Sequence, residues 1–173
     1  ILPTINIPEI MAYYYTIKSP NYKFKGERHN IYELTFVDNG TLETSIDNVN
    51  YTLNSYDLII YGKNQLHTQA VNSDSSCSYL TVMFDMECKD DSLICNKVFH
   101  CRKELYRAIR TFAKNISSTL PYSENLILSN FHEIIIRLFQ DDYLGEETDK
   151  LPTETQQYFQ DELLEGILAY IDK

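Results

Sequence analysis

Between Ile10 and Met86, short apolar runs alternate with turn-forming residues, and this pattern predicts a β-rich part of the chain. Runs of β-branched and aromatic residues are typical of strands. We expect strands at residues 10–17, 31–37, 42–47, 50–53, 57–61, 66–71 and 77–86. Asn, Asp, Gly and Ser separate them, as in Asp38-Asn39-Gly40. Short strands at such regular spacing favour a closed sheet, either a sandwich or a barrel.

The segments before the second strand are expected to be irregular. Pro3 and Pro8 frame an Ile-rich strip in residues 1–8, which favours an extended arm over a helix. This arm could instead be a first strand that seals one edge of the sheet. Residues 19–27 contain Pro20 and Gly26 and read as a polar loop.

After Asp85 the apolar spacing changes from the period of a strand to that of a helix. One amphipathic helix is predicted at 102–117, where Leu105, Ile109 and Phe112 recur at spacings of four and three. A second is predicted at 124–144, with Ser123 as its N-cap. Residues 156–173 form a third amphipathic pattern after an acidic linker containing Pro152.

The helix at 124–144 is apolar over more than one stripe, which predicts burial on two sides. One continuous seam consists of Ile127, Phe131, Ile134 and Leu138. Left in water, such a seam would exceed the apolar patches that soluble monomers carry. We therefore expect a homodimer with these four residues at its interface. In the alternative, the C-terminal helix folds back and covers the seam within one chain.

Composition and charge restrict the partners. The chain has 173 residues and a formal net charge of −10, so its surface should repel DNA phosphates. No apolar run approaches the roughly 18 residues that span a bilayer, and no signal peptide is recognisable. We expect a cytoplasmic chain without membrane contact. The four cysteines lack paired zinc-site spacing and are expected to be free thiols.

Glu33 is followed after six residues by Gly40, with His29 before it and His67 after it. These positions resemble the two sequence motifs of cupin barrels. More specifically, YELTFVDNGTLETSIDNVNYTLNSYDLIIYGKNQLH resembles the effector-binding domain of AraC-family bacterial transcription regulators. The resemblance covers residues 28–86 by pattern, and the rest by the order of elements.

The resemblance implies an α+β chain with a cupin-like barrel at 1–90. It further implies helices for dimerisation at 91–145, packed on the barrel, and a linker with the first helix of an absent helix-turn-helix domain at 146–173. The barrel would bind a small effector, the arm could fold over it, and DNA would be bound only by the absent domain. No enzymatic activity is expected.

Alternation along the strands assigns the barrel interior. If His29 and Glu33 point inward, as the resemblance implies, other side chains of the same parity line the interior with them. The expected ligand-binding residues are His29, Glu33, Thr35, Val37, His67, Gln69, Tyr79 and Thr81. A few convergent polar groups on an apolar wall are what a small-molecule site requires.

Two other functions stay open at this point. In a metal-dependent cupin enzyme, His29, Glu33 and His67 would be the ligands. However, Glu27 stands where the first motif has its leading histidine, and Tyr56, Gly62, Asn64 and Val71 stand at the second motif's glycine, proline, glycine and asparagine positions. Because of these departures we expect no metal and no other cofactor. The third possibility is a structural dimerisation module with a filled barrel and no ligand.

Overall fold

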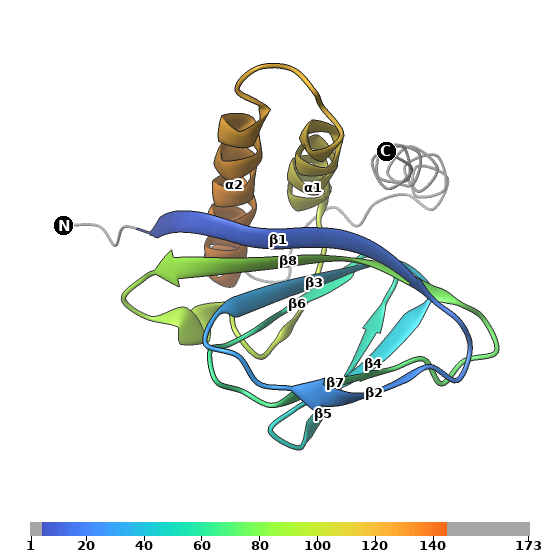
Figure 1. Ribbon diagram of the computed structural model, residues 1–173. Coiled ribbons are helices and arrows are strands. Elements are labelled where there is room, and N and C mark those ends of the chain that lie inside the picture. The colour runs from blue at the N-terminus through green and yellow to red at the C-terminus, as the bar shows by residue number, and fades with distance from the viewer. Residues whose placement is uncertain (1–4, 145–173) are drawn as a thin grey trace. The chain divides into compact units, whose positions relative to one another are not determined.

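The computed structural model describes residues 5–144, which form an open barrel of two antiparallel sheets followed in the chain by two helices (Figure 1). The α+β class expected from the sequence is confirmed. The chain divides into two compact units, and the boundary falls between His100 and Cys101.

Five strands form the larger sheet, in the order β1-β8-β3-β6-β9. Their bounds are β1 Asn6–Lys18, β8 Cys77–Glu87, β3 Tyr32–Asn39, β6 Asp57–Tyr61 and β9 Val98–His100. The smaller sheet has the order β2-β7-β4-β5. Its strands are β2 Lys23–Glu27, β7 His67–Ala70, β4 Thr41–Ile46 and β5 Val49–Asn54. Every pairing is antiparallel.

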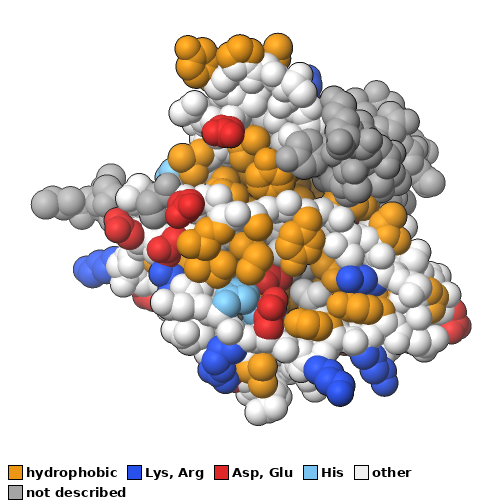
Figure 2. Space-filling view, viewed as in Figure 1, with side chains coloured by type: hydrophobic (Ala, Val, Ile, Leu, Met, Phe, Trp, Pro, Cys, Tyr) orange, Lys and Arg blue, Asp and Glu red, His pale blue; other side chains and the backbone are white. Residues whose placement is uncertain are grey.

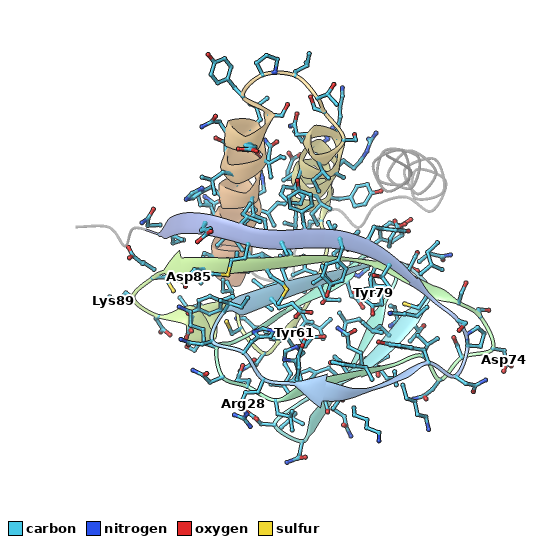
Figure 3. The ribbon with its side chains drawn as sticks, viewed as in Figure 1. Arg28, Tyr61, Asp74, Tyr79, Asp85 and Lys89 are labelled. Atoms are coloured by element: carbon cyan, nitrogen blue, oxygen red, sulfur yellow. The ribbon has the colours of Figure 1, made fainter. Side chains whose placement is uncertain are left out.

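An apolar cluster fills one part of the space between the two sheets. It consists of Val37, Leu42, Ile46, Leu53, Ile59, Tyr61, Val71, Cys77 and Tyr79, each almost fully buried. These side chains come from alternate positions of their strands, so the period of two predicted from the sequence is the period of the core. Tyr61 and Tyr79 can be followed into this interior in Figure 3.

Two strands in this unit correct the sequence prediction. Residues 23–27, expected in a polar loop, form edge strand β2, which pairs with β7. Three residues that were not expected in a strand, 98–100, pair with β6 as β9. β2 is mostly polar and β9 has only three residues, so the strand conformation of both depends on the partner strand and leaves no local pattern. The sheet-forming unit consequently extends beyond residue 90 to His100.

For residues 1–8 the sequence allowed either an extended arm or a first strand. Residues 6–8 belong to strand β1. Residues 1–4 and the predicted linker and third helix at 146–173 lie outside the described residues. The fold-back of that helix therefore stays untested. No helix within residues 5–144 is long and apolar enough to cross a membrane.

The second unit contains α1 (Lys103–Ile116) and α2 (Ser123–Leu144), close to the predicted bounds. They pack against each other, with the rings of Phe112 and Phe131 5.6 Å apart. Ser123 does not stand before the helix as an N-cap. It opens the helix, and its hydroxyl donates a hydrogen bond to the Leu120 carbonyl (2.7 Å).

The α2 seam expected at a dimer interface is buried within the single chain. Ile127 is 7% exposed, Phe131 0%, Ile134 2% and Leu138 0%. These side chains are therefore unavailable to a partner in this fold, which corrects the predicted interface residues. Among the α2 side chains whose placement the structure describes, residues 123–140, the large apolar ones that are exposed are Leu126 (51%) and Ile136 (42%).

Candidate functional site

Four side chains with metal-binding atoms converge beside the apolar cluster. They are Glu27 at the end of β2, His29 in the loop that follows, Glu33 on β3 and His67 at the start of β7. One ligand atom from each lies within 4.8 Å of all the others. The register of β2 on β7 places Glu27 directly opposite His67, and cross-strand partners share a face of the sheet.

Glu33 occupies the centre of this four-residue cluster. Its Oε2 lies 3.2 Å from His29 Nε2 and 3.4 Å from His67 Nε2. Glu27 Oε1 lies 3.9 Å from the same His67 nitrogen. The two imidazole rings meet edge to face, with centroids 5.0 Å apart.

Backbone carbonyls fix the orientation of both imidazoles. His29 Nδ1 lies 3.0 Å from the Ile31 carbonyl oxygen, and His67 Nδ1 lies 3.2 Å from that of Gln65. A carbonyl can only accept a hydrogen bond, so each Nδ1 carries a proton. In the neutral ring the other nitrogen, Nε2, then carries a lone pair, and in both residues it faces the carboxylates.

In this arrangement the lone pairs of the two Nε2 atoms face the lone pairs of the carboxylate oxygens. His67 Nε2 is buried and makes no hydrogen bond within the described residues, although two carboxylate oxygens are near it. A buried polar atom without a partner costs free energy. The cluster is therefore arranged to receive a positive charge between its four donors.

The pKa values of the two central groups shift in opposite directions. Burial alone would raise the pKa of Glu33, but the His29 and His67 imidazoles outweigh it and hold the pKa below its usual value. The hydrogen bond to Glu33 raises the pKa of His29, against the lowering effect of burial. The two shifts have one cause, because a proton on His29 Nε2 and a negative charge on Glu33 stabilise each other.

Tyr61 packs against the His67 imidazole. Its ring stacks on the imidazole with centroids 4.3 Å apart and an interplanar angle of 11°. The Tyr61 hydroxyl lies 3.1 Å from Thr44 Oγ1. Burial raises the pKa of Tyr61 to about 12, so the phenol stays neutral at physiological pH.

The structure places the other predicted ligand-binding residues on the same inner surface. Thr35 is buried and its hydroxyl donates to Glu33 Oε1 (3.4 Å). The Tyr79 hydroxyl donates to Gln69 Oε1 (2.8 Å). Thr81 lies opposite Thr35 across β8 and β3. Val37 belongs to the apolar cluster. Their role in ligand binding stays a prediction.

Glu27 and Tyr61 were missing from the residues predicted for this site. The sequence places Glu27 at the leading histidine position of the cupin motif, where an added carboxylate could still help to hold a metal, but in a segment expected to be a loop. The alternation that placed Val37 and Glu33 inward continues across β6 to Tyr61, which is the partner of Glu33 in the register. Cross-strand pairing identifies both residues as part of the site, and this pairing cannot be read from the sequence.

The residues present fit a divalent metal ion. Ligand atoms bound about 2.0–2.2 Å from a first-row ion lie roughly 3–4 Å from one another, and the three measured separations, 3.2, 3.4 and 3.9 Å, fall in that range. The carbonyls of Ile31 and Gln65 are the outer hydrogen-bond partners that metal-binding histidines usually have. Glu27, His29, Glu33 and His67 would hold the ion.

Access to the cluster is from the side of β2. The side chains of Glu27 and His29 are 47% and 17% exposed, whereas those of Glu33 and His67 are 2% and 1% exposed. Figure 2 shows histidine and acidic side chains together at the surface, between groups of hydrophobic side chains. The buried donors are therefore reached past the exposed ones.

Two backbone positions without glycine adopt a left-handed conformation. Tyr56 and Asn64 stand at the glycine positions, with φ of 72° and 59°. This left-handed region is unusual for an aromatic residue. The turn at Asn64, which precedes His67, therefore adopts its left-handed conformation without a glycine.

Comparisons with known proteins agree with this fold. No family model matches the chain, and no curated protein matches it. Among solved structures, ToxT from Vibrio cholerae matches with a TM-score of 0.52 at 18% identity, over 82% of this chain and 60% of ToxT. A cupin barrel protein from Salinispora arenicola matches with a TM-score of 0.40 at 16% identity, over 48% of this chain and 76% of its own.

A third similar structure is the cupin domain of an XRE-family transcriptional regulator from Enterobacter cloacae. It matches with a TM-score of 0.39 at 14% identity, over 47% of this chain and 94% of that domain. At these identities the likeness concerns the fold alone. The β-rich unit has the antiparallel, cupin-like barrel fold that the sequence predicted, and the chain continues from it into two helices.

Proposed function

We propose that this chain is the effector-sensing part of a cytoplasmic AraC-family transcription regulator from a bacterium. The observation that carries the sensing role is the set of polar side chains buried inside the barrel. Glu33, His67 and Gln69 are 2%, 1% and 7% exposed. Burying such groups costs stability unless they are paired. His67 Nε2 is buried without a hydrogen-bond partner within the described residues, a cost that a purely structural barrel would have no reason to keep.

Architecture supports the regulator part of the proposal. ToxT, an AraC-family protein, matches 82% of this chain with a TM-score of 0.52, so the match extends beyond the β-rich unit of residues 1–100. The resemblance of residues 28–86 to AraC-family effector domains points the same way. In the complete regulator, DNA would be bound by a separate domain, because the net charge of −10 disfavours phosphate contacts here.

Ligand binding would act on DNA binding through linkage. A ligand shifts an equilibrium between two conformations only by its difference in affinity for them. The proposal also includes a homodimer, since regulators that read repeated half-sites are commonly two-fold symmetric. Because the α2 seam is buried, that contact would involve other residues, of which Leu126 and Ile136 are exposed candidates.

The test is direct identification of what the domain binds. Small molecules released from the purified chain are identified by mass spectrometry, metals are measured by elemental analysis, and binding of each hit is then titrated. We expect His67→Ala to weaken binding at least about tenfold, as loss of a buried contact of roughly 1.4 kcal/mol or more does. Glu43→Gln, on β4 and hydrogen-bonded only to Thr52 in the described structure, is the matched control.

If His67→Ala binds the ligand as well as the parent does, the assigned site is wrong. If the domain retains nothing and no released compound binds, the structural module with a filled barrel is the better reading.

A metal-dependent cupin enzyme is the second candidate, and one observation favours it. The cupin motif has a histidine as its fourth metal ligand, and in this structure Glu27 supplies a donor beside His29, Glu33 and His67 instead. A bound divalent ion would act there as a Lewis acid toward an oxygen of a small substrate. Catalytic turnover by the metal-loaded chain would establish this candidate in place of the sensor.

A further inference from the structure

We propose that the effector sensed at this site is a divalent metal ion with a preference for oxygen ligands, Mn²⁺ or Fe²⁺, and that Glu27 sets this preference. The inference rests on the sensing role proposed above, and it adds the chemical class of the effector. It also assigns a function to the exposed carboxylate that replaces the leading histidine of the cupin motif.

The charge of the cluster selects a cation. Glu27 and Glu33 contribute two carboxylates, and both imidazoles turn Nε2 toward them. Two basic side chains near these residues in the sequence are held elsewhere. Arg28 pairs with Asp47 and donates to the Asn64 carbonyl, and Lys63 pairs with Asp85. An anionic effector would therefore meet two negative charges, whereas a dication neutralises them.

The unpartnered nitrogen of His67 indicates a metal ion. His67 Nε2 is buried, makes no hydrogen bond within the described residues, and lies between the oxygens of Glu33 and Glu27. Its lone pair needs an electron acceptor. A metal ion accepts all four electron pairs at once, and each imidazole keeps its proton on Nδ1.

The donor set determines which ion is favoured. Two carboxylates and two imidazoles give equal numbers of oxygen and nitrogen donors. Carboxylates suit Mn²⁺, and a mixture of histidine and carboxylate is typical of Fe²⁺, whereas a third imidazole would favour Ni²⁺ and Zn²⁺. Glu27 is the member of the set that provides this difference.

Exposure makes the site suitable for reversible binding. The Glu27 side chain is 47% exposed and the buried pair, Glu33 and His67, is reached past it. Gly26 brings this end of β2 close to β7, because a Cβ there would lie 2.7 Å from the His67 carbonyl oxygen. An ion can therefore enter beside Glu27, which becomes its last ligand, and exchange with the surrounding solution.

The experiment compares affinities for two ions in four proteins. The whole chain is stripped with a chelator and titrated calorimetrically with MnCl₂ and with NiCl₂, as parent, Glu27→His, Glu27→Gln and the control Glu43→Gln. We expect about one ion per chain. Glu27→His should raise the Ni²⁺-to-Mn²⁺ affinity ratio about tenfold or more, and Glu27→Gln should weaken Mn²⁺ binding. Glu43→Gln should match the parent, and thermal melting verifies that all four proteins fold.

An unchanged ratio in Glu27→His overturns the role of Glu27, and absence of binding at millimolar metal overturns the inference as a whole. These failures are distinguishable from failure of the proposed function. A chain that binds no metal but retains an organic compound, lost in His67→Ala, remains a sensor of another ligand. A chain that binds Mn²⁺ through Glu27 and catalyses turnover is an enzyme, and the sensing role fails.

Discussion

At the scale of single residues, the histidines show how hydrogen bonds to the backbone prepare a site. The carbonyls of Ile31 and Gln65 hold Nδ1 protonated, so that Nε2 of each ring faces Glu33. The hydrogen bond between His29 and Glu33 raises the pKa of His29. Stability and protonation are therefore linked at this residue.

This linkage predicts a pH dependence in chelator. A group whose pKa is raised in the folded state stabilises the fold below its unfolded pKa, here near 6.5, and loses that contribution as pH rises through the folded value. The melting temperature of the metal-free chain should thus fall as pH rises above about 6.5. The fall should be smaller in His29→Gln, which lacks the titrating imidazole. An equal fall in His29→Gln would contradict this account.

At the scale of elements, edge strand β2 depends on one glycine for its close approach to β7. Gly26 has φ +105° and lies in the irregular stretch of the pairing between Phe24 and Glu27. The left-handed region is readily adopted only by glycine. The position of Glu27 beside His67 is therefore determined by a backbone property of its neighbour.

Gly26→Ala should destabilise the fold by about 1–3 kcal/mol, from the strained backbone and the contact with the His67 carbonyl. Urea unfolding measures the change. Gly62→Ala is the matched control, since Gly62 has no left-handed φ and its added Cβ would meet the end of the flexible Gln65 side chain. We expect a smaller loss there. Equal losses in both variants would show that the approach of β2 to β7 has no special requirement.

At the scale of the whole molecule, α2 has one isoleucine that is buried within the chain and another that is exposed and available to a second chain. Ile134 is 2% exposed and Ile136 is 42% exposed, although they are two residues apart. A charge at the first position must be accommodated inside the chain, and at the second it stays in water.

Ile134→Asp should therefore lower the free energy of unfolding by several kcal/mol, whatever the oligomeric state. Ile136→Asp should leave it within about 0.5 kcal/mol, as is usual for surface substitutions. If the proposed dimer uses the exposed face of α2, sedimentation should show dissociation in Ile136→Asp. A well-folded Ile134→Asp chain would contradict the burial of the seam.

The sequence by itself determined the features that depend on local periodicity. Alternation of side chains placed Val37, Glu33 and Tyr79 on the inner face, and helical spacing predicted α1 and α2 within one residue at each end. These predictions succeeded because strand and helix geometry fix which side chains share a face, whatever the element packs against.

Only the tertiary structure decided the features that depend on which elements meet. The register of β2 on β7 brought Glu27 to His67, and pairing with β6 made a strand of residues 98–100. Burial of Phe131 follows from its packing against Phe112 on α1, whereas the spacing of apolar residues on α2 was equally compatible with a dimer. An apolar stripe requires cover, but its sequence does not say which surface provides it.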